Sequence, residues 1–221
     1  MTKQDFDPAQ WCVPGVRQLK PYEPGKPMAE LPRELGIDGI IKLASNENPL
    51  GFGCAAVFAR YAFAVYAIVS QAAGADLRVA DAQTPDHPHQ PYGHDVDTLL
   101  AAVDDSTRVV FVANPNNPTG TYLTQAEMTQ LMEGVPGHTV VVIDEAYYDY
   151  AAPYAEDYPD TRALLERYQN LVVLRTFSKA YGLAGVRIGY ALAGAAMTYC
   201  LNRVRLAFNP SSLGQVAAVA A

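Results

Sequence analysis

The stretch TVVVIDEAY, residues 139–147, decides the fold class of this chain. Its first five residues are all β-branched, and such a run is typical of a strand that is buried on both faces of a sheet. Residues 108–113 and 171–174 form similar apolar runs of strand length. Strands of this composition occur in mostly parallel sheets, because helices cover both faces of such sheets.

Helical patterns alternate with these strands. Thr124 opens one helix, since Glu127 three positions later can complete a capping box. We predict further helices over residues 55–73, 95–103, 161–168 and 195–206, and further strands over residues 40–44, 77–80 and 187–192. The alternation indicates an α/β fold in which helices flank a mostly parallel sheet. Ligands of such sheets bind at the carboxyl ends of the strands.

The chain divides into two parts by composition. Residues 1–36 are rich in Pro and Gly, so we interpret them as an N-terminal arm that forms no regular element. Residues 37–221 contain every predicted strand and helix. We therefore expect a single sheet-containing domain over that range.

The composition of the 221 residues argues against several classes of protein. A net charge of -7 without a basic cluster in the sequence argues against a nucleic-acid partner. Residues 61–75 carry no charge but fall short of the roughly 20 residues that span a bilayer, so we expect no membrane association. The three cysteines are widely spaced, which favours reduced thiols in a cytoplasmic protein over disulfides or a metal site.

The run RTFSKAYGLAGVR, residues 175–187, surrounds Lys179 with hydroxyls, glycines and an arginine. A lysine amine can form a Schiff base with an aldehyde. The hydroxyls of Thr176 and Ser178, together with the guanidinium of Arg187, can hold a phosphate by charge-assisted hydrogen bonds. These groups suit an aldehyde cofactor that carries a phosphate.

Two further motifs follow predicted strands. The turn NPNNPTG, residues 114–120, is rigid and can present Asn117 to a phenolate oxygen. Asp144 can pair with a protonated ring nitrogen, and Tyr147 can reach the same phenolate from the other side. Taken alone, the first motif also fits a plain turn and Asp144 also fits a helix cap. The order of Asn117, Asp144 and Lys179 along the chain favours a site for pyridoxal phosphate.

These motifs resemble those of fold-type I pyridoxal-phosphate aminotransferases of class I/II. The segments YEPGKP, IKLASNENPLG, NPNNPTG, DEAY, LRTFSKAYGLAGVRIGY and NRVRLAFNPSSLGQ more narrowly resemble histidinol-phosphate aminotransferase. The resemblance implies a large domain like that of aspartate aminotransferase and a cytoplasmic homodimer. It also implies transfer of an amino group between L-histidinol phosphate and 2-oxoglutarate, with glutamate as the product, in histidine biosynthesis.

The resemblance also implies a role for each motif residue. Lys179 holds pyridoxal phosphate as a Schiff base and later shuttles the proton. Asp144 faces the ring nitrogen, while Asn117 and Tyr147 contact the ring oxygen.

The remaining family positions concern the phosphate, the ring face and the substrate. Ser178 and Arg187 match phosphate-binding positions, and Thr176 is a further candidate. Phe63 matches the aromatic residue that stacks on the ring, although a core aromatic would show the same pattern. Two positions match residues near the substrate: Tyr22 and Asn46.

The chain departs from the family pattern in two places. Relatives carry a glycine-rich turn and a helix soon after the segment that ends here at Gly51, and they continue beyond residues 211–214 into a small C-terminal domain with substrate-binding arginines. We therefore expect either an internally deleted and C-terminally truncated form or part of a longer protein. In both cases residues 37–221 are a partial pyridoxal-phosphate-binding large domain, and the small domain is largely missing from the sequence. A related aromatic amino acid aminotransferase, a threonine-phosphate decarboxylase and an inactive cofactor-binding remnant remain alternatives.

Overall fold

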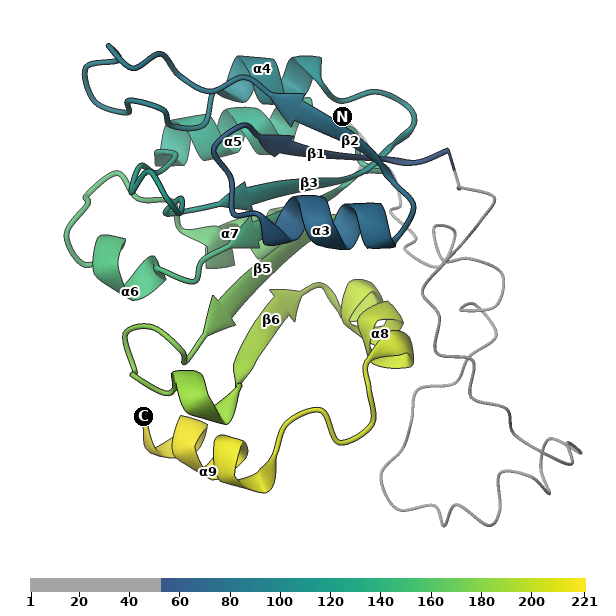
Figure 1. Cartoon of the computed structure of the whole chain (residues 1–221), viewed down its shortest axis with the longest axis vertical. Helices are drawn as coiled ribbons and strands as arrows, with labels where there is room; N and C mark the ends of the chain where they lie inside the picture. Colours follow the sequence, from purple (N-terminus) through teal and green to yellow (C-terminus); the bar gives the residue numbers. More distant parts are fainter. Residues whose placement is uncertain (1–52) are drawn as a thin grey trace, which may run out of the picture.

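A six-stranded sheet organises residues 53–221, which are the part of the chain that the computed structural model describes (Figure 1). The strand order is β2-β1-β3-β4-β5-β6, and β6 alone runs antiparallel to its neighbour. The strands are β1 (Ala55–Ala59), β2 (Asp76–Ala80), β3 (Thr107–Ala113), β4 (Val140–Asp144), β5 (Leu171–Thr176) and β6 (Gly189–Ala193). The predicted α/β class with a mostly parallel sheet flanked by helices is confirmed.

Helices connect these strands, as the alternating pattern predicts. They are α3 (Val65–Ala72), α4 (Val96–Ala101), α5 (Gln125–Gly134), α6 (Tyr148–Ala151), α7 (Thr161–Arg167), the 3-10 helix η2 (Ala184–Val186), α8 (Ala195–Val204) and α9 (Ser212–Ala220). Thr124 and Glu127 form the expected capping box at the start of α5. Asp95 caps α4 by accepting a hydrogen bond from the backbone amide of Thr98 at 3.1 Å.

The two faces of the sheet are covered differently. Helices α4, α5 and α7 contribute Leu99, Leu131 and Leu164 to a core cluster that also includes buried valines of β3, β4 and β5. On the opposite face, Tyr66 of α3 packs in a smaller cluster with Phe58. Because side chains alternate along a strand, β1 and β3 contribute to both clusters: Val57 and Val110 lie in the first, and Phe58 and Phe111 in the second.

The prediction of a helix over residues 55–73 is wrong in its first part. Residues Ala55–Ala59 form strand β1, and the helix begins only at Val65. Alanine favours helices, but propensity is a weak preference that tertiary contacts override. Here β1 pairs with β2 on one side and β3 on the other, and all five of its residues are buried. Helices α6 and α9 were not predicted, and the strand expected over residues 187–192 begins at Gly189.

Several expectations concern residues outside the described part of the chain. These are the N-terminal arm over residues 1–36, the strand over residues 40–44, and the candidate substrate residues Tyr22 and Asn46. The division of the chain at residue 37 also stays a prediction.

Within residues 53–221, no helix has both the length and the apolar character needed to cross a bilayer. The same residues contain no group of three or more His, Cys, Asp or Glu side chains arranged to hold a metal ion.

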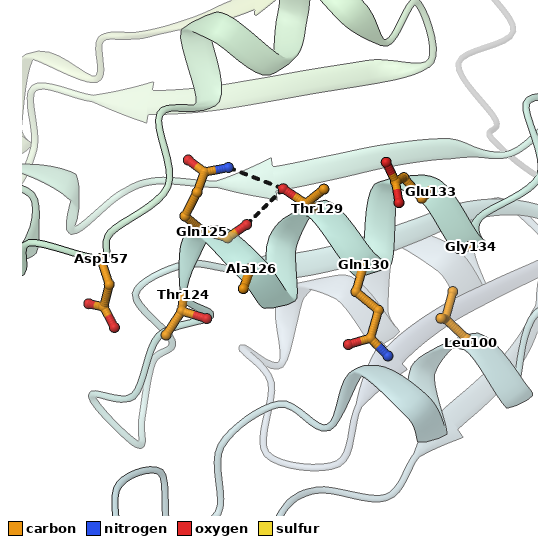
Figure 2. Close-up of a pocket in the computed structure, with 9 residues that line it drawn as sticks. All are labelled: Leu100, Thr124, Gln125, Ala126, Thr129, Gln130, Glu133, Gly134 and Asp157. Atoms are coloured by element: carbon orange, nitrogen blue, oxygen red, sulfur yellow. Dashed lines mark hydrogen bonds between the residues drawn. The ribbon is translucent and has the colours of Figure 1, made fainter.

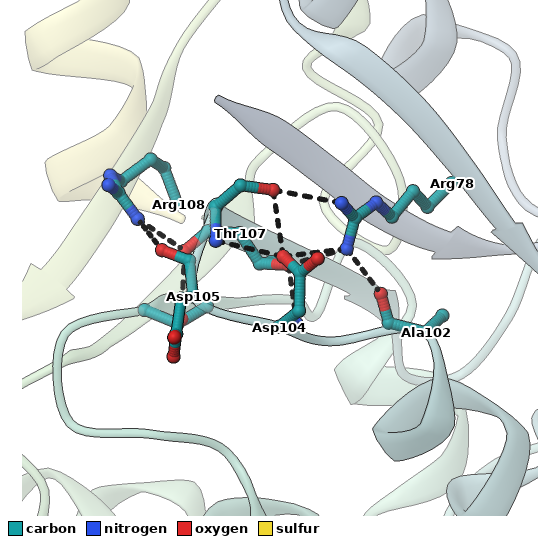
Figure 3. Close-up of polar contacts among 8 residues, drawn as sticks. Arg78, Ala102, Asp104, Asp105, Thr107 and Arg108 are labelled. Atoms are coloured by element: carbon teal, nitrogen blue, oxygen red, sulfur yellow. Dashed lines mark hydrogen bonds and ion pairs between the residues drawn. The ribbon is translucent and has the colours of Figure 1, made fainter. Parts of the chain in front are cut away.

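An ionic cluster ties β2 to the connection between α4 and β3 (Figure 3). Arg78 lies 2.7 Å from the Asp104 carboxylate, and its guanidinium also donates to the Ala102 carbonyl at 3.2 Å and the Ser106 hydroxyl at 2.8 Å. Asp104 in turn accepts a hydrogen bond from the Ser106 amide at 2.8 Å. The hydrogen bonds from Arg78 and Ser106 hold the pKa of the Asp104 carboxyl well below its usual range.

Replacing this carboxylate should change the acid stability of the chain. Because the pKa of Asp104 is lower in the folded state, its contribution is present above the unfolded value of about 3.9 and is lost as the pH falls through the folded value. We expect Asp104→Asn to lower the melting temperature slightly at neutral pH, since the pair is solvent-exposed, and the difference from the unmodified chain to shrink at about pH 2.

Thermal unfolding followed by circular dichroism at both pH values would measure this effect. Asp105→Asn is the matched control, because Arg108 donates to the backbone carbonyl of Asp105, which the substitution keeps. Equal melting temperatures for the two variants at neutral pH would contradict the account.

Candidate active site

Five predicted site residues line one small pocket of about 110 Å³ at the carboxyl end of the sheet. They are Phe63, Asn117, Asp144, Tyr147 and Lys179. Asn117 follows β3, Asp144 ends β4 and Lys179 follows β5. These three strands pair in parallel as neighbours. Parallel pairing places the carboxyl ends of the three strands at the same edge, so residues far apart in the sequence meet there.

The turn between β3 and α5 is held by the side chains of its own asparagines. Asn114 accepts a hydrogen bond from the Leu123 amide at 2.6 Å and donates to the Leu123 carbonyl at 3.3 Å. Asn116 donates to the Thr119 hydroxyl at 2.8 Å. Both X-Pro bonds of the turn, at Pro115 and Pro118, are cis. The side-chain hydrogen bonds of Asn114 and Asn116 hold the turn in which Asn117 lines the pocket.

Both oxygens of the Asp144 carboxylate accept hydrogen bonds. Oδ2 accepts from the Tyr66 hydroxyl at 2.7 Å, and Oδ1 accepts from the Ala146 amide at 3.1 Å. The residue ends β4 opposite Ala113 of β3, so its side chain lies on the sheet face that α3 covers. The carboxylate is therefore oriented by donors from a helix and from its own loop.

The amine of Lys179 lies over an aromatic ring of the same pocket. Its Nζ is 5.1 Å from the centroid of the Tyr147 ring. A turn follows Lys179, in which the Gly182 amide donates to the Lys179 carbonyl at 2.9 Å and Gly182 has a φ of 66°. Glycine suits that position because it adopts positive φ at little cost. The lysine thus stands in a short, turned segment directly after β5.

The three predicted phosphate-binding residues lie outside the lining of this pocket: Thr176 ends β5, and Ser178 and Arg187 lie in the connection from β5 to β6. Thr176 donates to the Ile188 carbonyl at 3.4 Å and accepts from the Ser178 amide at 3.1 Å. Arg187 is exposed and donates to the Ala184 carbonyl at 2.9 Å. Their role toward a phosphate stays a prediction.

Phe63 lies at the rim of the pocket and is 47% exposed, so it is not a buried core aromatic. The residue that sequence reasoning missed is Tyr66, which also lines the pocket and meets the Phe63 ring edge-on at 6.2 Å. Sequence position could not reveal it, because Phe63 precedes α3 and a tyrosine in that helix also fits the core.

A buried ion pair lies immediately behind Asp144. Arg175 donates from Nε to Glu145 at 2.7 Å, and the Thr161 hydroxyl donates to the other carboxylate oxygen at 2.9 Å. Glu145 is 1% exposed. The Arg175 guanidinium also lies 3.6 Å from the centroid of the Tyr148 ring. These contacts join β4, β5 and α7 beneath the site.

A larger, open hollow lies elsewhere, along α5 (Figure 2). Two of its polar side chains already pair: Gln125 donates to the Thr129 hydroxyl at 3.2 Å, and Thr129 donates to the Gln125 backbone carbonyl at 2.8 Å. The charged residues in its lining, Glu133 and Asp157, are both acidic. Such a surface does not suit a phosphate-bearing ligand, so the smaller pocket is the candidate active site.

Comparison with known proteins matches residues 38–221 to the aminotransferases of class I and II. This chain belongs to that family. The resemblance expected from the motifs is thereby confirmed.

Named relatives of this aminotransferase chain share about two fifths of their residues with it. It is 41% identical over 272 positions to histidinol-phosphate aminotransferase 2 of Methylococcus capsulatus, covering 95% of this chain and 72% of the relative. It is 42% identical over 271 positions to the protein of the same name from Pseudomonas fluorescens, covering 94% and 71%.

A solved structure shows the same fold. The histidinol-phosphate aminotransferase of Sinorhizobium meliloti, in complex with pyridoxal-5'-phosphate, is 30% identical with a TM-score of 0.67. The match covers 76% of this chain and 43% of that one, so the aminotransferase chain spans less than half the length of the solved relative.

The alignments also contain an internal difference. The match to the Methylococcus capsulatus protein extends over 272 positions, although this aminotransferase chain has only 221 residues. The relative therefore carries positions within the matched region that have no counterpart here. This excess is consistent with an internal departure, and its place after Gly51 stays a prediction.

Removing one partner of the ion pair behind Asp144 should strongly destabilise the fold. We expect Arg175→Met to lower the free energy of unfolding by roughly 3–5 kcal/mol, because it leaves the buried Glu145 carboxylate uncompensated. Urea unfolding would measure the loss. Arg167→Met is the matched control, since Arg167 pairs with Glu133 at the same 2.7 Å but with 60% and 54% of the two side chains exposed. We expect that control to lose less than about 1 kcal/mol, and equal losses would contradict the account.

Proposed function

We propose that this chain is a pyridoxal-phosphate-dependent transaminase that moves an amino group between L-histidinol phosphate and 2-oxoglutarate in histidine biosynthesis. The observation that carries the proposal is the position of Asp144 and Lys179 in the lining of one pocket. The named relatives at 41% and 42% identity support the choice of substrate.

The donor set of the pocket fits pyridoxal phosphate. Lys179 offers an amine to an aldehyde, Asp144 offers a carboxylate to a ring nitrogen, and Phe63 offers an exposed aromatic face. Asn117 and Tyr147 offer an amide and a hydroxyl to a ring oxygen. When bound, this cofactor supplies an electron sink for the carbanion that forms at the α-carbon of the substrate.

Each pocket residue then has a distinct task. Lys179 Nζ would hold the cofactor through its aldehyde carbon and, once the substrate amine has displaced it, would be free to take the proton from the substrate α-carbon. The Asp144 carboxylate stabilises a positive charge on the ring nitrogen, because an opposite charge nearby favours the protonated form. The proposal assigns the cofactor phosphate to Ser178 and Arg187, with Thr176 as a further candidate.

The proposal extends to the surroundings of the site. We propose that Tyr22 and Asn46 bind the substrate. We also propose that the protein is a cytoplasmic homodimer. Exposed apolar side chains on α9, such as Val216 and Val219, support association with a second copy, since large apolar patches on a protein surface mark interaction sites.

The substrate can be tested by a half-reaction with three amino donors. The chain loaded with pyridoxal phosphate is mixed with L-histidinol phosphate, L-phenylalanine or O-phospho-L-threonine, and the loss of cofactor absorbance is followed. The proposal expects the fastest loss with L-histidinol phosphate. A preference for L-phenylalanine would favour an aromatic transaminase, release of carbon dioxide from O-phospho-L-threonine would favour a decarboxylase, and failure to bind the cofactor would overturn the proposal.

Replacing the amine should abolish the reaction without unfolding the chain. We expect Lys179→Ala to lose the visible absorbance of the lysine-bound cofactor and to lose turnover, with the proton-transfer step slowed by at least roughly 10²–10⁴. Lys179 is exposed, so the melting temperature should stay within error of the unmodified chain. Added methylamine should restore part of the rate, because it supplies the missing base. Retention of both absorbance and turnover in Lys179→Ala would refute the assignment.

A further inference from the structure

Tyr66 is fixed at the floor of the pocket by its ring. It stacks on Phe111 with 5.0 Å between ring centroids and an interplanar angle of 4°, and only 3% of the residue is exposed. Phe111 belongs to β3 and Tyr66 to α3, so the stack joins the helix to the sheet (Figure 1). A change that removes only the hydroxyl would leave this stack in place.

The Tyr66 hydroxyl completes the fixation of Asp144. It donates to Asp144 Oδ2 at 2.7 Å, while the Ala146 amide donates to Oδ1 at 3.1 Å. A carboxylate has about four acceptor sites, so both oxygens keep capacity for a further donor. Two donors on different oxygens define the plane of the carboxylate, and the free positions are those available to a ligand in the pocket.

This hydroxyl is a permanent donor. Burial, and then the neighbouring charge of Asp144, raise the pKa of Tyr66 far above its ordinary value. The hydroxyl therefore stays protonated, and able to donate, at neutral pH. Asp144 therefore keeps this hydrogen bond to its Oδ2 at neutral pH.

We propose that Tyr66 is a positioning residue that acts through Asp144 to keep the proton on the ring nitrogen of the bound cofactor. The proposal rests on the proposed function and deepens it. Without the hydroxyl, Asp144 would lose one of its two orienting donors, and its carboxylate would no longer be held in place to face the ring nitrogen. The ring would then be a weaker electron sink.

Tyr66→Phe tests this proposal, with Tyr122→Phe as the matched control. Tyr122 also donates to a carboxylate, that of Asp157 at 2.8 Å, but this pair is exposed and lies outside the pocket lining. The first readout is the resonance of ¹⁵N-labelled pyridoxal phosphate bound to each chain. We expect the ring-nitrogen signal of Tyr66→Phe to move toward that of neutral pyridine, while the control keeps the signal of the unmodified chain.

The second readout is the rate of the half-reaction with the amino donor. A hydrogen bond to a charged group typically corresponds to about tenfold to a hundredfold in an equilibrium or rate. We expect Tyr66→Phe to lower the rate constant for loss of cofactor absorbance by about this factor, with the half-saturating donor concentration changed less than about twofold. A purely structural role would change the melting temperature and leave the nitrogen signal where it was.

The cofactor-free chain gives an independent check of the hydrogen bond. A buried hydroxyl that donates to a carboxylate should give a slowly exchanging proton signal far downfield, which Tyr66→Phe should remove and Asp144→Asn should shift. No such signal in the unmodified chain would overturn the proposal.

The two failures are distinguishable. An unmodified chain that does not bind pyridoxal phosphate would overturn the proposed function. A chain that binds it normally, but whose ring-nitrogen signal and rate are the same in Tyr66→Phe and Tyr122→Phe, would overturn only the role of Tyr66.

Discussion

The parallel register of β3, β4 and β5 is the constraint on which the rest of the structure depends. Ala113 pairs with Asp144, and Asp144 pairs with Leu174, so the three strands end at nearly the same level. Each strand is followed by one motif, and the motifs meet only because their strands end together. A slip of one residue in β4 would turn the Asp144 side chain to the opposite face, where a packed hydrophobic core would exclude a carboxylate.

One face of the sheet carries most of the hydrophobic core, and the other carries the candidate site. The face under α4, α5 and α7 is a continuous core of aliphatic side chains. The other face carries α3, whose Tyr66 reaches from a small aromatic cluster to the Asp144 carboxylate. The ion pair between Glu145 and Arg175 links the stability of the fold to the site, because the buried Glu145 directly follows Asp144 in the chain.

Sequence reasoning could predict the strands that are rich in β-branched residues and the three motifs that follow them, because the chemistry of Asn117, Asp144 and Lys179 is readable from residue type and order. It could not predict β1, because Ala55 and its neighbours favour a helix and become a strand only through pairing on both sides. It also missed Tyr66, since a tyrosine near a predicted aromatic stack looks like core until its hydroxyl is seen on a carboxylate.

The most direct test of the account is to identify the lysine that binds pyridoxal phosphate. The chain is loaded with the cofactor, reduced with borohydride to fix it covalently, digested and analysed by mass spectrometry. The other lysines, Lys3, Lys20, Lys26 and Lys42, all precede the described residues, so the peptides separate the possibilities cleanly. The account predicts modification of Lys179 at close to one cofactor per chain. Stoichiometric labelling of another lysine, or no labelling at all, would contradict it.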